Sequence, residues 1–423
     1  MHAVALWVCV AACVFFAARG AWKSTRGNGS DFAIYYRAGE AVLAGTDPMT
    51  VFGFIYLPVF AVLMAPLAAL PYTVAACMWQ ALSLAATLWC ARRCAQLATP
   101  SGERVAPWLW WTPLACTLRL VDSNLGYGQV NALTFAIVLE GLVALRRRRD
   151  ASAAVWFGFG AAVKLLPGVA LVWCALRRSW RTALVGTVAF AAFALLVPTL
   201  AMGPRASIDS LSEWWSHTAQ PYERGGNELL EARTYLPGQS LTAAGYRLLS
   251  TAPATSQGVS GPRANLLELD PESAGTLVKL AIALQIALFA ATVWLRRAER
   301  ASRDFAIEAA LALVTVLLVA PLVHKAHMLW IMLAYAAVFA AGRPDIPRAA
   351  LVARNALIAL SIVAVALTTP TITGGAASVG LLAHNAITWG VEALCVALLI
   401  ERWAPRQPQG SSLLSARRLA STA

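Results

Sequence analysis

Long apolar stretches alternate with short polar segments along almost the whole chain. A helix of about 20 mostly apolar residues is long enough to cross the hydrocarbon core of a membrane. The pattern predicts apolar segments at residues 3–22, 56–91, 105–121, 130–145, 154–176, 182–201, 275–295, 305–323, 327–341, 349–369 and 376–400. It therefore indicates an all-α, polytopic transmembrane bundle of about 10–12 membrane segments. The first segment lacks a basic leader region, so we expect an uncleaved helix rather than a signal peptide.

Arginine clusters stand at the ends of many of these segments. They are Arg92/Arg93, Arg146 to Arg149, Arg177/Arg178/Arg181, Arg296/Arg297/Arg300/Arg303, Arg343/Arg348 and Arg402/Arg406. Short cytoplasmic loops of membrane proteins are enriched in Lys and Arg. Placing every cluster in the cytoplasm gives a consistent count of crossings, provided that segment 56–91 crosses an odd number of times. The outer side then receives loop 23–55, loop 126–131, loop 202–274 and turn 321–327.

Segment 154–176 does not fit this scheme as a single span, because arginines stand at both of its ends. Lys164 and Pro167 interrupt it. Irregular backbone at membrane depth is tolerated where it lines a cavity, so we expect a re-entrant pair of half-helices. A lysine inside an apolar segment is a candidate for a functional site. The alternative is a lysine that snorkels to the membrane surface.

Composition supports a membrane protein and excludes other classes. Of the 423 residues, 59% are hydrophobic and 13% are charged, whereas a soluble domain has about 25% charged residues. The net charge of +13 lies in clusters at helix ends, so we expect no nucleic-acid partner. We expect one transmembrane domain over residues 1–404 and a disordered cytoplasmic tail over residues 405–423.

The first outer loop contains a helix with chemistry at its start. Ser30 is a good N-cap for a helix that begins at Asp31. The apolar positions that follow form one stripe, which predicts an amphipathic helix lying at the membrane interface and ending near Gly45. Asp31 is either a first-turn carboxylate favoured by the helix dipole or a functional group.

Further polar residues are expected on the same outer side. His324 and His327 are three residues apart, so both fit one helical face and can hydrogen-bond a carboxylate or a leaving phosphate. Plain interfacial histidines are the alternative. Gln129 and Asn131 either cap a helix or belong to a site. A zinc site needs further ligands, which no motif supplies, so we expect no metal.

These residues lie in motifs that resemble a known family. The GT-C class polyprenyl-phosphate-mannose-dependent alpha-mannosyltransferases, glycosyltransferase family 87, share similar motifs in the same order. The matching stretches are Asp31…Tyr35-Tyr36…Ala38…Gly45…Pro48, Tyr56-Leu57-Pro58, Ala65-Pro66-Leu67, GQVN at 128–131, AAVKLLPG at 161–168, PGQSL at 237–241 and APLVHKAHMLW at 320–330.

This chain departs from the family pattern at two motifs. Gly238 stands where the family has Asn, and Ala326-His327 stands where the family has paired histidines. His324 falls at the position of the family's Trp. Which histidine takes the family role is therefore open, and the alignment favours His327.

The resemblance implies a GT-C fold and a reaction. A polyprenyl phosphate carrying mannose or another hexose donates its sugar at the outer face of the plasma membrane. A lipid or glycan acceptor attacks in a single inverting displacement, with Asp31 as general base and His327 as second catalytic residue. The residues implied to bind the donor phosphate and sugar are Lys164, His324, Gln129, Asn131, Tyr35 and Gln239. No cofactor is implied, and we expect a monomer surrounded by membrane lipids.

Two other classes compete with this hypothesis. A secondary transporter places its site on broken helices of two related halves. Segment 154–176 resembles such a helix, but the sequence predicts no matching interruption in the second half. A polysaccharide ligase or polymerase also uses a long outer loop, but it would not need Asp31.

Overall fold

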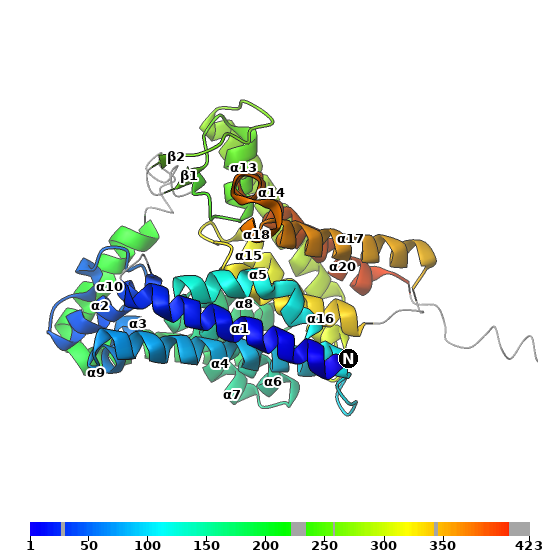
Figure 1. Cartoon of the computed structure of the whole chain (residues 1–423). Coiled ribbons are helices and arrows are strands. Elements are labelled where there is room, and N and C mark those ends of the chain that lie inside the picture. The colour runs from blue at the N-terminus through cyan, green and yellow to red at the C-terminus, as the bar shows by residue number, and fades with distance from the viewer. Residues whose placement is uncertain (27–29, 221–233, 257–258, 342–345, 406–423) are drawn as a thin grey trace, which may run out of the picture.

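The chain folds into a bundle of helices (Figure 1), described here from a computed structural model. The structure describes residues 1–26, 30–220, 234–256, 259–341 and 346–405. Within these ranges the only strands are β1 (Thr255–Ser256) and β2 (Val259–Ser260), which pair antiparallel. The prediction of an all-α fold is confirmed. The predicted tail lies almost entirely outside the described residues.

Five of the described helices are long and apolar enough to cross a membrane. They are α1 (His2–Thr25), α4 (Tyr72–Ala98), α9 (Trp180–Met202), α14 (Pro271–Leu295) and α17 (Arg348–Leu367). The bent pair α19 (Gly375–Ala383) and α20 (Ala386–Trp403) adds a sixth candidate. The chain is therefore a multi-pass membrane protein, as predicted.

Other predicted segments form shorter helices that complete the bundle. They are α3 (Pro58–Ala68), α5 (Thr112–Tyr127), α6 (Asn131–Arg146), α15 (Asp304–Val319) and α16 (Met332–Ala340). Segment 56–91 thus divides into the short helix α3 and the long helix α4. Pro71 precedes α4, and a proline favours a break in helical backbone before it. Of these two helices, only α4 is long and apolar enough to be a candidate span, so the odd number of crossings stays a prediction.

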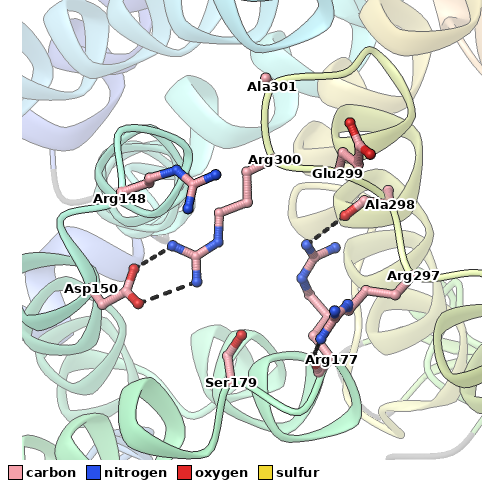
Figure 2. A pocket seen from close by; sticks show the side chains of 9 residues that line it. All are labelled: Arg148, Asp150, Arg177, Ser179, Arg297, Ala298, Glu299, Arg300 and Ala301. Carbon is pink, nitrogen blue, oxygen red and sulfur yellow. Dashed lines mark hydrogen bonds and ion pairs between the residues drawn. The ribbon is translucent and has the colours of Figure 1, made fainter.

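The predicted interruption at Lys164 is confirmed. Helix α7 (Asp150–Val163) ends there in extended backbone, and the chain returns through the 3-10 helix η3 (Leu166–Gly168) and α8 (Val169–Leu176). Residues before α7 and after α8 line the same pocket (Figure 2). The segment therefore enters and leaves at one end of the bundle, as a re-entrant pair requires.

Close contact with α9 supports this hairpin. A Cβ at Gly158 of α7 would lie 2.5 Å from the carbonyl oxygen of Gly186 in α9. Such a distance leaves no room for a side chain, so these glycines permit the two backbones to approach. The rest of the core centres on α15 and α16, whose side chains are buried almost throughout. A helix that is apolar all round is expected at the centre of a bundle.

Those arginines of the clusters that lie in the described residues gather at one end of the bundle, as the topology predicted. Arg146 donates to the carbonyl of Leu97, at 2.6 Å, and to that of Ser302. Arg297 donates to the carbonyl of Arg177, and Arg296 donates to that of Arg402. Loops far apart in the sequence are thereby joined at a single surface.

One expectation about the second half was wrong. Segment 376–400 was predicted as a single apolar stretch, but α19 and α20 meet at an angle of 57°. Asn385 lies between them in the left-handed region, at φ 59°, a conformation that Asn adopts more readily than most residues. Its side chain accepts a hydrogen bond from Arg247. The second half is therefore interrupted as well.

The two predicted outer loops contain helices of their own. Loop 23–55 holds α2 (Asp31–Leu43) and η1 (Pro48–Thr50), so the predicted helix start at Asp31 is confirmed. Loop 202–274 holds α10 (Pro204–Trp214), η4 (Trp215–Ala219), α13 (Leu241–Leu249) and the two strands. The strands and α13 project together from the bundle (Figure 1). A short helix α18 (Pro370–Thr373) links α17 to α19.

Candidate active site

The start of α2 is held in place from two sides. The Ser30 hydroxyl caps the helix by accepting from the backbone N–H of Phe32. It also donates to the carbonyl of Tyr127 at the end of α5, and it accepts from Ser24 at the end of α1. An N-cap combined with two tertiary contacts fixes where the first side chain of the helix points. That side chain is Asp31.

A tight turn between α5 and α6 brings the GQVN motif to the same place. Gly128 has φ +64°, and a Cβ there would lie 2.8 Å from the Ser30 hydroxyl. Both facts require glycine. Trp79 of α4 donates to the Gly128 carbonyl at 2.8 Å, and Trp330 donates to the Asn131 carbonyl at 3.1 Å. The motif is thus anchored by two indole groups.

Four side chains form one hydrogen-bonded chain across three helices. Gln129 Nε2 donates to Asp31 Oδ2 at 2.7 Å. Asn131 Nδ2 donates to Gln129 Oε1 at 2.5 Å. Lys164 Nζ donates to Asn131 Oδ1 at 2.7 Å. Every link donates toward the carboxylate, so the two amide dipoles are aligned between an acid at one end and an amine at the other.

Asp31 keeps one oxygen available for chemistry. Oδ2 is held by Gln129, while Oδ1 accepts no hydrogen bond from any side chain in the described ranges. Burial raises the pKa of Asp31, and this is the largest influence on it. The Gln129 hydrogen bond and the charges of Lys164 and Lys23 lower the pKa in part. The result is a carboxyl of increased basicity in a fixed orientation.

The two histidines differ in their hydrogen bonds. His327 Nδ1 accepts from the backbone N–H of His324 at 3.1 Å, so its ring proton is on Nε2 when the ring is neutral. The His324 ring packs against Tyr235 in a tilted arrangement, with an angle of 60° between the planes and ring centroids 5.2 Å apart. Burial, followed by the nearby charges of Lys164 and Lys325, lowers the pKa of His324 to about 4. His324 is therefore neutral at pH 7.

Two cavities meet at Asp31. The larger has a volume of about 440 Å³ and is mostly apolar, with Lys164 and His327 among its lining residues. The smaller has a volume of about 170 Å³ and is lined by polar groups, including Tyr127, Tyr235 and Lys325. Both are lined by Asp31, Gln129 and His324. The carboxylate therefore faces an apolar chamber and a polar chamber at once.

Two residues implied by the family resemblance lie behind the cavities. Tyr35 is buried, and its hydroxyl hydrogen-bonds that of Tyr56 at 2.8 Å. Gln239 is fully buried and donates to the carbonyl of Leu382 at 3.0 Å. The backbone N–H of Gln239 also donates to the carbonyl of Val323, at 2.7 Å. The structure thus joins PGQSL to the histidine turn, while direct sugar contacts by Tyr35 and Gln239 stay predictions.

Among the cavity residues that were not singled out from the sequence, three tyrosines and a lysine are suited to bind a ligand. Tyr56 lines the larger cavity, and Lys164 Nζ lies 5.5 Å from the centre of its ring. Tyr127, Tyr235 and Lys325 line the smaller one. Tyr56, Tyr127 and Lys325 could have been found from the sequence, because each lies within or beside one of the motifs. Tyr235 has no such signal, because it reaches the site only through the fold of the long outer loop.

Among the described residues, no group of three or more His, Cys, Asp or Glu side chains is placed to hold a metal ion. The eight cysteines are free.

Comparisons with known proteins agree with the resemblance noted in the sequence. The family model for glycosyltransferase family 87 matches residues 54–321. This range includes Gln129, Asn131 and Lys164, while Asp31 and both histidines of the turn lie outside it. No solved structure matches the chain.

Two curated relatives are mycobacterial enzymes. One is a polyprenol-phosphate-mannose-dependent alpha-(1-2)-phosphatidylinositol mannoside mannosyltransferase of Mycobacterium tuberculosis, 29% identical over 52% of this chain and 43% of its own length. The other is a polyprenol-phosphate-mannose-dependent alpha-(1-2)-phosphatidylinositol pentamannoside mannosyltransferase of Mycolicibacterium smegmatis, 31% identical over 38% of this chain and 42% of its own length. The matches thus span less than half of these relatives. Because the family model covers more than half of this chain, the chain belongs to glycosyltransferase family 87.

Proposed function

We propose that the protein transfers a mannosyl group from a polyprenyl-phosphate donor to a glycolipid or glycan acceptor. Two cavities of different chemistry meet at one oriented carboxylate, and this observation carries the proposal. A lipid-linked sugar and a polar acceptor need such a pair of chambers on either side of a base. The named activities of the two mycobacterial relatives agree with this donor and with a glycolipid acceptor.

The larger cavity suits the donor. Its apolar lining, which includes Leu57, Leu165 and Leu322, suits a polyprenyl chain. The Lys164 ammonium and the His327 Nε2–H are donors for the phosphate. When the bond between the anomeric carbon and the phosphate oxygen breaks, the electron pair leaves with that oxygen. Positioned donors stabilise a charge that develops in this way.

The smaller cavity suits the acceptor. An acceptor hydroxyl there attacks the anomeric carbon and passes its proton to Asp31 Oδ1, so that one new C–O bond replaces the bond to phosphate. The increased basicity of Asp31 favours this proton transfer. Burial, the largest influence, lowers the pKa of Lys325 to about 8, so its amine still carries positive charge at neutral pH. This charge favours an acceptor with an anionic headgroup.

We infer the orientation of the site from the arginine clusters. They lie at the end of the bundle opposite to Asp31, and the positive-inside rule places them in the cytoplasm. Transfer is then expected at the outer face of the plasma membrane. Cysteine labelling at position 52, in the first outer loop, and at position 180 from either side of intact cells tests this orientation, because both residues are exposed. Labelling of both positions from the same side would overturn it.

The donor is tested with purified protein in lipid nanodiscs. Radiolabelled mannose is supplied either as polyprenyl-phosphate mannose or as a nucleotide sugar, together with a glycolipid acceptor. We expect labelled glycolipid with the lipid-linked donor alone. Label transfer from the nucleotide sugar in the absence of polyprenyl phosphate would contradict the proposal. A secondary transporter would instead move a solute across proteoliposomes without consuming the lipid donor.

A further inference from the structure

A second polar pocket lies at the opposite end of the bundle from Asp31. It has a volume of about 720 Å³ and lies where both ends of the α7–α8 hairpin meet the segment joining α14 to α15. Figure 2 shows Arg300 reaching Asp150 with Arg148 on the same side of the pocket, and Arg177 and Arg297 on the other side. Four guanidinium groups from three segments therefore face one space.

Two of these four arginines are neutralised by carboxylates. Arg177 is buried and paired with Glu308, and Arg300 is paired with Asp150. Their remaining donors are partly used as well, since Arg177 donates to the carbonyl of Ala298 at 2.8 Å. These pairs explain how the walls of the pocket are held together. The positive charges of Arg148 and Arg297 are not balanced by these pairs.

Arg148 and Arg297 have no carboxylate partner among the ion pairs of the described residues. Arg297 donates only to the carbonyl of Arg177, at 3.1 Å. The remaining acid on the rim, Glu299, points its carboxylate away from the guanidinium groups (Figure 2). Arg177 Nε is also buried without a hydrogen-bond partner in this part of the structure. The pocket thus combines unneutralised positive charge with unused donors.

The surroundings place the pocket at the level of lipid headgroups. Trp180 follows the pocket residue Ser179 directly and is exposed. Trp294 is also exposed, and the Arg178 guanidinium lies 4.2 Å from the centre of its ring. Tryptophans gather where membrane meets water. Basic pockets between transmembrane helices on the cytoplasmic side recognise anionic lipid headgroups.

We propose that this pocket binds the phosphate group of an anionic phospholipid from the same leaflet. Guanidinium groups match phosphate oxygens through paired N–H donors, which makes arginine well suited to such a ligand. The single negative charge of the bound phosphodiester offsets half of the combined charge of Arg148 and Arg297. It thereby ties the start of α7 to the α14–α15 connection, at the base of the hairpin that carries Lys164 at its tip. The site is independent of the transfer reaction.

Thermal unfolding of the purified protein in a neutral detergent tests this proposal. Phosphatidylglycerol, phosphatidylcholine or inorganic phosphate is titrated, and the rise in Tm gives the half-saturating concentration. We expect saturable stabilisation by phosphatidylglycerol that phosphatidylcholine does not give. In the double variant Arg148→Gln/Arg297→Gln, we expect the half-saturating concentration to rise at least about tenfold, which corresponds to about 1.4 kcal/mol.

The matched control is Arg149→Gln/Arg181→Gln, which removes the same charge from exposed arginines that flank the same hairpin outside the pocket. It should bind phosphatidylglycerol like the wild type. If both double variants bound phosphatidylglycerol equally weakly, the lipid would be attracted to the basic surface in general, and the proposed site would be overturned. Saturable stabilisation by inorganic phosphate alone would overturn the lipid source, and no stabilisation by either would overturn the proposal. If the Arg148/Arg297 variant does not fold, Ser179→Glu places a carboxylate in the pocket and should weaken lipid binding similarly.

Discussion

The hairpin of α7 and α8 carries cationic side chains at both its tip and its base, in contrasting environments. At the tip, Lys164 donates to Asn131, and the hydrogen-bonded chain leads through Gln129 to Asp31. At the base, Arg177 and Arg300 pair directly with Glu308 and Asp150. The tip separates its opposite charges by two aligned amides, whereas the base brings them into contact.

The two arrangements suit the base and the tip of the hairpin to different roles. Direct pairs neutralise charge and hold segments together, which is a structural role. A separated acid and amine each keep reactivity toward a ligand placed between or beside them. Both also line a cavity at the tip. We therefore expect substitutions at the base to change stability and substitutions at the tip to change transfer.

The largest effect on stability is expected from Glu308→Gln. The Glu308 carboxylate is fully buried and accepts from Arg177, from Trp173 at 2.9 Å and from the backbone N–H of Ala298 at 2.6 Å. Removing its charge leaves Arg177 buried without a counter-ion, which costs about 3–5 kcal/mol. Asp150→Asn breaks the more exposed pair and should cost about 0–1 kcal/mol. Thermal unfolding in detergent measures the stability of both variants. Equal losses of stability in Glu308→Gln and Asp150→Asn would contradict the difference expected between the buried and the exposed pair.

Lys164→Met tests the tip. If Lys164 binds the leaving phosphate as proposed, loss of its ammonium should lower the transfer rate about 10²–10³-fold. The unfolding temperature should stay the same or rise, because an apolar side chain replaces a buried charge. Lys279→Met, at an exposed position on α14, is the control and should transfer normally. A loss of stability that accounts for the whole loss of activity would assign Lys164 a structural role instead.

Gln129→Leu should have a smaller effect, which is a change in how the transfer rate depends on pH. A general base must be ionised, so transfer falls as pH drops through the pKa of Asp31. Burial raises this pKa, and the Gln129 hydrogen bond lowers it in part. Removing that bond should therefore move the acid limb of the rate profile to higher pH. Tyr35→Phe removes a hydroxyl bonded to Tyr56 rather than to Asp31, and its acid limb should not move. An acid limb that moves to lower pH in Gln129→Leu would refute this assignment.

Much of the architecture follows from patterns that act locally. Each arginine cluster reports the side of its own loop, so the common end of the bundle was predictable without knowing how helices pack. The start of α2 was predictable because Ser30 is a strong N-cap. The break at Lys164 was predictable because a lysine and a proline interrupt an apolar run.

Other features depend on tertiary packing and leave no local signal. The series of side-chain hydrogen bonds from Lys164 to Asp31 forms only when α2, α6 and α7 pack in one defined arrangement. Tyr235 reaches the smaller cavity only because the outer loop folds back to the histidine turn, where Lys325 N–H donates to the carbonyl of Pro237. The bend before α20 depends on Asn385, whose partner Arg247 is distant in the sequence.

The central claim is that Asp31 is the base of a lipid-donor mannosyl transfer. It is tested most directly by single-turnover transfer from radiolabelled polyprenyl-phosphate mannose, comparing wild-type protein, Asp31→Asn and Glu40→Gln in nanodiscs. Glu40 lies exposed on the same helix, so its variant controls for a change of charge on α2. We predict a rate about 10³-fold lower for Asp31→Asn and an unchanged rate for Glu40→Gln. Wild-type turnover by correctly folded Asp31→Asn would contradict the account.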